Sequence, residues 1–180
     1  MEPDATHPNV FLVGPMGSGK SAVGRQLAQR LGLEFVDCDE EIEARTGVDI
    51  AYIFEKEGEP GFRQREAEVL DELTSRPGIL VATGGGAVLD PRSRARLRER
   101  GRVVYLRTSV DQQLARTRRS DDRPLLNNPD PRGTLVRLYE QRAPLYDEIA
   151  DVVVDTDGRK VRTVVDAICR RLGVTTGFEA

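Results

Sequence analysis

Short apolar runs alternate with amphipathic segments along the whole chain. Most runs are apolar at every position rather than at every second one. This predicts strands buried on both faces, as in a parallel sheet with helices on each side. The intervening segments carry apolar residues at helical spacing, so the pattern predicts an α/β domain. The expected strands are residues 10–13, 34–39, 79–83, 103–106 and 152–154.

Capping and breaking residues mark the expected helix boundaries. Asp49 stands at an expected N-cap, and Asp90 precedes a proline, which is favoured in the first helical turn. Gly47 and Gly58 separate neighbouring helical segments. The expected helices are residues 21–31, 40–46, 49–57, 60–75, 90–100, 109–118, 132–149 and 159–172.

The length of 180 residues predicts one domain, which we expect over residues 9–172. Residues 1–8 are polar and lack an apolar signal-peptide segment, so they are expected to form a disordered tail, and residues 173–180 a flexible C-terminus. No apolar run approaches the roughly 20 residues of a membrane span, so no membrane association is expected. The single histidine, His7, lies in the tail, which excludes a Ser-His-Asp triad and a histidine-based zinc site.

Glycines form a phosphate-binding motif directly after the first strand. Residues 14–21 read GPMGSGKS and fit the pattern G-x-x-x-x-G-K-[ST] between a strand and a helix, the context that supports this motif. Glycine backbone N–H groups and the helix N-terminus would hold phosphates, Lys20 would reach the β- and γ-phosphates, and the Ser21 hydroxyl would ligate Mg²⁺. The alternative is a glycine turn without a ligand. The expected nucleotide-binding residues of the loop are Gly17, Ser18, Gly19, Lys20, Ser21 and Ala22.

Charge is distributed unevenly along the chain. Residues 34–72 carry 14 acidic and 4 basic residues, net −10, whereas residues 92–142 carry 14 Arg and 6 acidic residues, net +8. A basic half raises nucleic-acid binding as a possibility. No aromatic residues are interleaved for base stacking, so a solvated helix face is the preferred interpretation and no nucleic-acid partner is expected. Cys38 and Cys169 form neither a disulfide framework nor a metal spacing, which fits a reducing cytoplasm.

Carboxylates end the second expected strand. Alternation along that strand places Asp37 and Asp39 on one face, at the sheet edge where α/β proteins bind ligands. Asp37 is the candidate for indirect help to Mg²⁺, because the strand 79–83 ends in Thr83 rather than Asp. Ordinary helix capping is the alternative for Asp39.

Four further features are candidates for substrate contacts. Arg63 and Glu66 share a helix face, where a surface ion pair is the alternative. Gly84, Gly85 and Gly86 follow a buried strand and suit close backbone approach to a ligand rather than a plain turn. Residues 119–130 have no period and contain Arg123, so they predict either a lid with a cationic finger or a passive loop. Arg142, just before a proline, is a surface residue when taken alone.

Together these residues resemble the shikimate kinases, over about residues 9–172. The glycine loop is shared by many kinases, whereas the Asp-x-Asp, Phe-Arg-x-x-Glu and triple-glycine set is specific. The motifs that carry the resemblance are Gly14 to Ser21; Asp37-Cys38-Asp39; Ile53-Phe54, Gly58-Glu59 and Phe62-Arg63-x-x-Glu66; Thr83 to Gly86; Arg123-Pro124-Leu125-Leu126; and Arg142 to Tyr146.

The resemblance implies a three-layer P-loop fold like that of nucleoside-monophosphate kinases, with strand order 2-3-1-4-5 and a mobile lid at about residues 116–130. It implies ATP-dependent phosphorylation of the 3-hydroxyl of shikimate, giving shikimate 3-phosphate and ADP in chorismate and aromatic amino-acid biosynthesis. The cofactor would be Mg²⁺, and the enzyme a monomer acting on small molecules.

The resemblance also implies residue roles. Shikimate would be held by Asp39, Arg63, the backbone of residues 84–86 and Arg142, with Glu66 orienting Arg63. Arg123 would contact ATP and Arg159 would lie near the adenine. Lys20, Asp39 and Arg123 are the expected catalytic residues, and Ser21 and Asp37 the metal-site residues. Two alternatives stay open: a gluconate-type kinase on the same scaffold, and a nucleotide-dependent binding module without catalysis.

Overall fold

Five parallel strands form one sheet in the order β2-β3-β1-β4-β5. The computed structural model describes residues 8–117 and 126–174. The expected α/β class and strand order are therefore confirmed. The strands are β1 (Val10–Val13), β2 (Glu34–Asp37), β3 (Ile79–Ala82), β4 (Arg102–Arg107) and β5 (Val152–Asp155).

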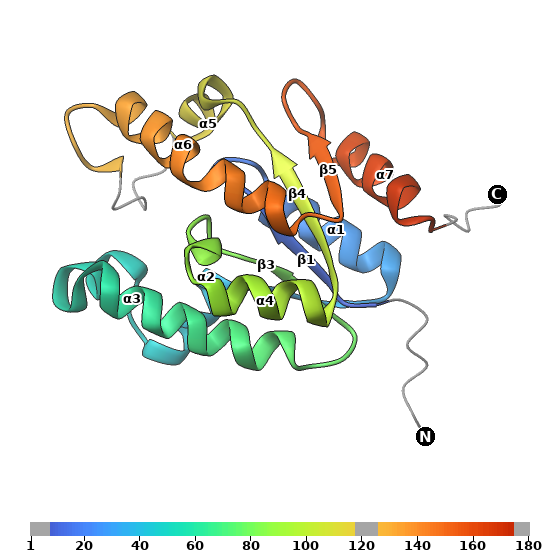
Figure 1. The fold of residues 1–180 in the computed structure, drawn as a ribbon, viewed down its shortest axis with the longest axis horizontal. Coiled ribbons are helices and arrows are strands. Elements are labelled where there is room, and N and C mark those ends of the chain that lie inside the picture. Colours follow the sequence, from blue (N-terminus) through green and yellow to red (C-terminus); the bar gives the residue numbers. More distant parts are fainter. Residues whose placement is uncertain (1–7, 118–125, 175–180) are drawn as a thin grey trace.

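Helices connect the strands and cover both faces of the sheet (Figure 1). A short 3-10 turn, η1 (Ala87–Leu89), follows β3. The helices are α1 (Lys20–Leu31), α2 (Cys38–Thr46), α3 (Ile50–Thr74), α4 (Pro91–Arg100), α5 (Val110–Thr117), α6 (Pro131–Ile149) and α7 (Val161–Leu172).

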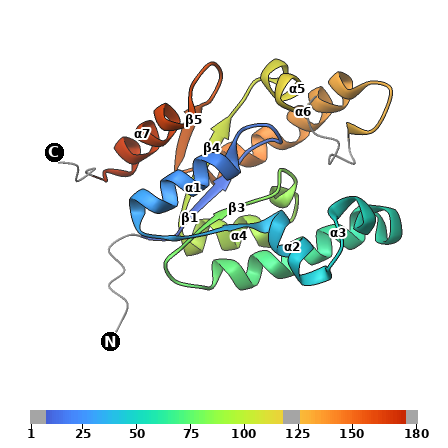
Figure 2. The same cartoon turned by 180° about the vertical axis from the view of Figure 1, so that it is seen from behind.

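Alternation along the buried strands creates two hydrophobic layers. In β1, Val10 and Leu12 pack with residues of α1 and α7, whereas Phe11 and Val13 pack with residues of α2, α3, α4 and α6. Figure 2 shows α1 and α7 together on one face of the sheet, the face turned away from α4. All four β1 side chains are buried, as the unbroken apolar run predicts.

One strand boundary differs from the expectation. The second strand ends at Asp37 rather than at residue 39, because the Asp37 carboxylate caps α2 by accepting the N–H groups of Asp39 and Glu40. Asp39 therefore lies in the first turn of α2, and strand alternation is not what places it. The break expected between the helices at 49–57 and 60–75 is confirmed: α3 consists of two helical parts joined at Gly58, whose φ of 70° and ψ of 179° are not helical.

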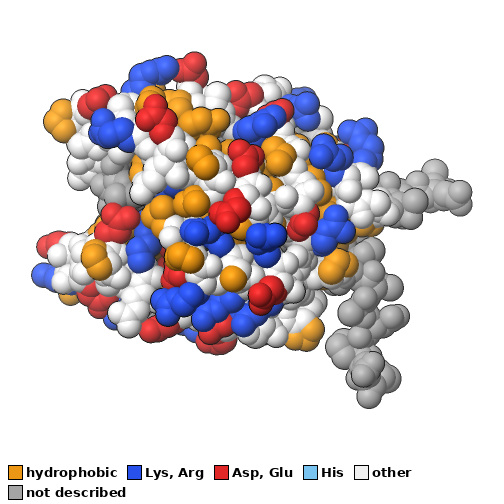
Figure 3. All heavy atoms as spheres, viewed as in Figure 1, with side chains coloured by type: hydrophobic (Ala, Val, Ile, Leu, Met, Phe, Trp, Pro, Cys, Tyr) orange, Lys and Arg blue, Asp and Glu red, His pale blue; other side chains and the backbone are white. Residues whose placement is uncertain are grey.

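The basic segment after β3 forms α4, and its arginines lie among acidic side chains. Figure 3 shows basic and acidic side chains mixed over α3 and α4. Arg96 and Arg100 both pair with Asp71 of α3, and Arg94 pairs with Glu148 of α6. This arrangement supports the interpretation of α4 as a solvated, ion-paired helix face.

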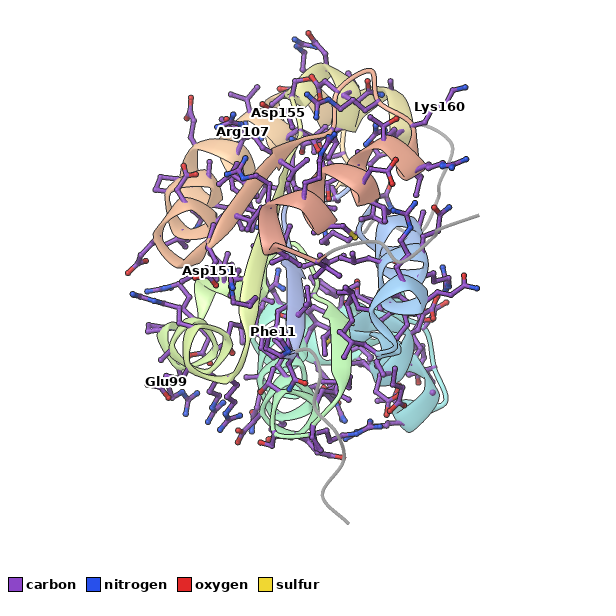
Figure 4. The ribbon with its side chains drawn as sticks, turned by 90° about the vertical axis from the view of Figure 1, so that its right-hand side faces the viewer. Phe11, Glu99, Arg107, Asp151, Asp155 and Lys160 are labelled. Atoms are coloured by element: carbon purple, nitrogen blue, oxygen red, sulfur yellow. The ribbon has the colours of Figure 1, made fainter. Side chains whose placement is uncertain are left out.

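The loops after β1, β2 and β3 lie at the carboxyl ends of neighbouring strands, where α/β proteins bind ligands. The last strands are joined at the same end by Arg107 and Asp155, whose side chains lie next to each other in Figure 4 and pair at 2.6 Å. Most of the expected N-terminal tail and C-terminal segment, and Arg123 with much of the expected lid, lie outside the described residues. Within the described ranges, no helix is long and apolar enough to cross a membrane.

Candidate functional site

The loop between β1 and α1 turns through left-handed backbone conformations. Gly17 has φ 75° and Gly19 has φ 87°, a region where a side chain would be strained. Gly19 is also the N-cap of α1, so the loop ends at the first turn of that helix. N–H groups and the positive end of the helix dipole meet there, which is the arrangement that binds phosphate.

Lys20 lies in the first turn of α1 and is folded over this loop. Its Nζ donates to the carbonyls of Gly14 at 2.7 Å and Pro15 at 2.8 Å, and to the Ser18 hydroxyl at 3.4 Å. These contacts keep the ammonium group at the loop. A compact charge on a flexible stem can turn from these carbonyls to a phosphate.

Ser21 and Asp37 form an oxygen pair next to the glycine loop. The Ser21 hydroxyl donates to Oδ2 of Asp37, while Oδ1 of Asp37 accepts the capping N–H groups of α2. A hydroxyl and a carboxylate are ligands that Mg²⁺ accepts, and this ion usually keeps several waters and phosphate oxygens besides. The pair fits that ion, and no cluster of three or more acidic, His or Cys ligands occurs in the described part of the chain.

Arg63 and Glu66 of α3 form an ion pair whose acidic member is buried, while the Arg63 side chain is partly exposed. Arg63 Nη1 donates to Glu66 Oε1 at 2.9 Å, and Glu66 is only 2% exposed. Arg63 Nη2 also contacts Glu59 at 3.3 Å. Glu66 thereby holds the Arg63 guanidinium from the protein side, and the alternative of a solvated helix pair is wrong.

The three glycines after β3 lie directly against charged side chains. A Cβ on Gly84 would lie 2.6 Å from Glu66 Oε2 and 3.1 Å from Asp39 Oδ1, and a Cβ on Gly86 would lie 2.3 Å from Arg63 Nη2. Real Cβ atoms essentially never lie within 3.0 Å of such an atom, so the contacts with Glu66 and Arg63 would force these side chains to move. The glycines are needed because this segment fills the space between the carboxylates of α2 and α3 and the guanidinium of Arg63.

Gly84→Ala is expected to reduce the free energy of unfolding by about 1–3 kcal/mol, because the new methyl group displaces Glu66. Gly85→Ala is the matched control, since its Cβ would meet Met16 N at 3.4 Å, an ordinary contact distance. Urea unfolding of both variants measures the difference. If both variants lost the same unfolding free energy, the close contact of Gly84 with Glu66 would not be important for stability.

Arg142 brings a second guanidinium to the glycine segment. It lies in α6, is 3% exposed, and its Nη1 would be 3.5 Å from a Cβ on Gly85. Burial lowers its pKa, and its Nε has no hydrogen-bond partner among the described residues. A buried cation with an unpaired donor is costly unless an anion meets it. The guanidinium groups of Arg63 and Arg142 both lie against the glycine segment, and planar groups of this kind are chemically able to bind a carboxylate.

Burial raises the pKa of the Glu66 carboxyl to about 7, and Asp39 adds to this rise while Arg63 and Arg142 oppose it. An unfolded Glu titrates near a pKa of about 4.3. Between these values the folded state holds a proton that the unfolded state has lost, so this group lowers folding stability as pH rises.

Glu66→Gln removes this titration. The unaltered protein should lose stability through this group as pH rises, and the variant should not. The unfolding free energy of the variant minus that of the unaltered protein should therefore increase by on the order of 2 kcal/mol between about pH 5 and about pH 8. Urea unfolding of both proteins across this range provides the measurement, and all other carboxylates cancel in the difference. A difference that stays constant with pH would contradict the raised pKa.

Two arginines lie at the other side of the glycine loop. Arg159 is exposed in the turn between β5 and α7, at the same end of the sheet as the loop. Arg116 of α5 was not predicted: its Nη1 donates to the Gly17 carbonyl at 2.8 Å, and its Nη2 lies 3.5 Å from the Thr156 carbonyl. It ties α5 to the loop. Among so many arginines in this half of the sequence, no local pattern singles it out.

Comparisons with known proteins identify the family of this chain. The family model described as "Shikimate kinase" matches residues 16–173. A shikimate kinase of Halorhodospira halophila is 58% identical over 167 residues, covering 93% of this chain and 94% of the relative. A shikimate kinase of Alteromonas mediterranea is 54% identical over 166 residues, covering 92% and 97%. The solved structure of shikimate kinase from Acinetobacter baumannii in complex with shikimate has a TM-score of 0.90 and 51% identity, covering 92% of this chain and 93% of that one.

Proposed function

This chain belongs to the shikimate kinase family and is an ATP-dependent phosphotransferase for shikimate, and we propose that the site described above performs the transfer. One observation carries the proposal: two guanidinium groups converge on a segment without side chains, next to the phosphate-binding loop. This arrangement suits an acceptor that carries one carboxylate and several hydroxyls.

Shikimate would lie on the glycine segment. Arg63 and Arg142 would bind its carboxylate, because charge-assisted bonds from planar guanidinium groups match that anion. Glu66 would keep Arg63 in place from behind, across 2.9 Å. Asp39, whose Oδ1 lies close to Gly84, would accept from the substrate hydroxyls, and N–H groups of Gly84, Gly85 and Gly86 would line the remaining side.

ATP would occupy the loop after β1. The backbone of Gly17, Ser18, Gly19, Lys20, Ser21 and Ala22 would hold its phosphates. Ser21 and Asp37 would hold Mg²⁺, directly or through water, and the ion would neutralise phosphate charge when bound. Arg123 would approach the phosphates from the expected lid, and Arg159 would lie near the adenine.

Phosphoryl transfer passes through a loose transition state, so catalysis depends mainly on positioning and on positive charge. Lys20 would leave the loop carbonyls and neutralise charge on the transferring group, assisted by Arg123. Asp39 would orient the 3-hydroxyl and take its proton late in the transfer. Because the transition state is loose, this base assistance contributes less than the cationic groups do.

The reaction is tested by ADP release from the purified protein with MgATP and shikimate, and with gluconate or quinate in its place. We expect release that depends on shikimate, with far slower release for the other two acceptors. Gluconate-dependent release would favour the gluconate-type alternative, and release with no acceptor preference would contradict the assignment of Arg63 and Arg142.

We also propose that the enzyme acts in the cytoplasm as a monomer. Cys38 and Cys169 are both free and buried, and burial raises the pKa of each thiol, which keeps them protonated and unreactive. Thiols of this kind suit a reducing compartment. Light scattering coupled to gel filtration measures the oligomeric state.

A further inference from the structure

The three glycine carbonyls of residues 84–86 are all engaged. Those of Gly84 and Gly86 each accept a backbone N–H from the residue three positions further along the chain, at 3.1 Å. The carbonyl of Gly85 accepts instead from a side chain, the Tyr146 hydroxyl of α6, at 2.5 Å. The middle peptide of the segment therefore depends on a single hydroxyl group from another element.

Tyr146 is well suited to donate this bond under all ordinary conditions. Burial raises its pKa to about 12, while the charge of Arg142 opposes the rise, so the phenol stays protonated. Its ring is 1% exposed and packs on Tyr105 with centroids 5.0 Å apart. Core packing therefore fixes the position of the Tyr146 ring, so its hydroxyl points at the Gly85 carbonyl in a single orientation.

Gly85 is also where the two halves of the site come together. A Cβ at this position would lie 3.4 Å from Met16 N in the nucleotide loop and 3.5 Å from Arg142 Nη1. Arg142 and Tyr146 are four residues apart on α6, so they lie on one helix face. If the Gly85 carbonyl rotated, the backbone that faces the substrate would change its orientation. The distances from this segment to Met16 and to Arg142 would change as well.

We propose that Tyr146 is a positioning residue for the acceptor substrate: its hydroxyl fixes the plane of the peptide between Gly85 and Gly86. In a trans peptide the N–H points opposite to the carbonyl, so fixing the Gly85 carbonyl toward α6 directs the Gly86 N–H away from α6. The inference rests on the proposed function, in which this segment contacts shikimate. Tyr146 itself touches neither substrate.

The neighbouring Tyr105 provides a matched control. It belongs to the same aromatic pair and is equally buried, but its hydroxyl has no hydrogen-bond partner among the described residues. Tyr146→Phe and Tyr105→Phe therefore remove the same atom from adjacent rings and leave both rings in place. Only the first removes a bond to the glycine segment. Because the Tyr146 hydroxyl also interacts with Arg142, amide exchange of the segment is the readout that reports on the bond to Gly85 itself.

Steady-state kinetics of the two variants test the proposal. Tyr146→Phe is expected to raise the shikimate KM about tenfold, the cost of leaving a buried carbonyl unsatisfied, with the ATP KM nearly unchanged. Amide hydrogen exchange of residues 83–87 should become faster in this variant. Tyr105→Phe should change neither quantity. An unchanged shikimate KM in Tyr146→Phe, or equal changes in both variants, would overturn the proposal.

The exchange measurement separates this proposal from the proposed function. If the unaltered protein fails to phosphorylate shikimate, the function is wrong, whereas exchange at residues 83–87 still reports whether Tyr146 fixes the segment. If Tyr146→Phe does not fold, carbon-13 NMR of ζ-labelled tyrosines in the unaltered chain decides instead. The signals are assigned from Phe variants of the other three tyrosines. Shikimate should shift the Tyr146 signal and leave the Tyr105 signal in place. An unshifted Tyr146 signal would overturn the inference.

Discussion

Lys20→Ala is expected to lower kcat by about a thousandfold or more, while the shikimate KM changes by less than about threefold. The reason is that Lys20 supplies charge to the transferring phosphoryl group and lies on the nucleotide side of the site. In the structure its Nζ donates to the carbonyls of Gly14 and Pro15, the first two residues of the phosphate-binding loop. The measurement is the rate of ADP release at saturating ATP.

Lys20→Arg should restore little of this rate, because a planar guanidinium does not replace a compact ammonium inside a narrow loop. Lys56→Ala is the matched control: Lys56 is exposed on α3 and should leave kcat unchanged. Turnover by Lys20→Ala close to that of the Lys56→Ala control would contradict charge neutralisation by this residue.

Arg63→Ala should weaken shikimate binding by about a hundredfold or more and leave ATP affinity intact. The substitution removes one of two guanidinium groups that meet the carboxylate, and it also leaves Glu66 buried without its 2.9 Å partner. Calorimetric titration of each substrate separately measures both affinities.

Arg65→Ala is the matched control for this prediction. Arg65 lies two residues further along α3 and pairs with Glu57 on the exposed side of the helix, at 2.7 Å. A surface pair of this kind contributes little, so both affinities should stay unchanged. A loss of ATP affinity in Arg63→Ala, with shikimate affinity retained, would mean that Arg63 belongs to the nucleotide half of the site.

Much of the fold follows from the apolar pattern. The five strands were predictable because doubly covered parallel strands are apolar throughout, as in β1 and β3. The end of β2 was not predictable from alternation, because the side chain of Asp37 caps α2 and stops the strand two residues early. By contrast, the break at Gly58 was predictable, because its backbone is not helical and it separates the two helical parts of α3.

The parts of the site differ in how far the sequence revealed them. The residue spacing of the glycine loop identifies it as a phosphate-binding motif. The triple glycine indicated that the backbone lies close to a ligand there. By contrast, the burial of Glu66 and Arg142 depends on how α3 and α6 pack, which no local pattern encodes. The contacts of Arg116 and Tyr146 join elements far apart in the chain, so only the folded structure brings them to light.

The most direct test of the central claim is a crystal structure of this protein with shikimate and a non-hydrolysable ATP analogue. We predict that the shikimate carboxylate contacts both Arg63 and Arg142, and that the 3-hydroxyl lies between Asp39 and the terminal phosphate. A carboxylate bound away from both arginines, or a 3-hydroxyl directed away from the loop of Lys20, would contradict the account.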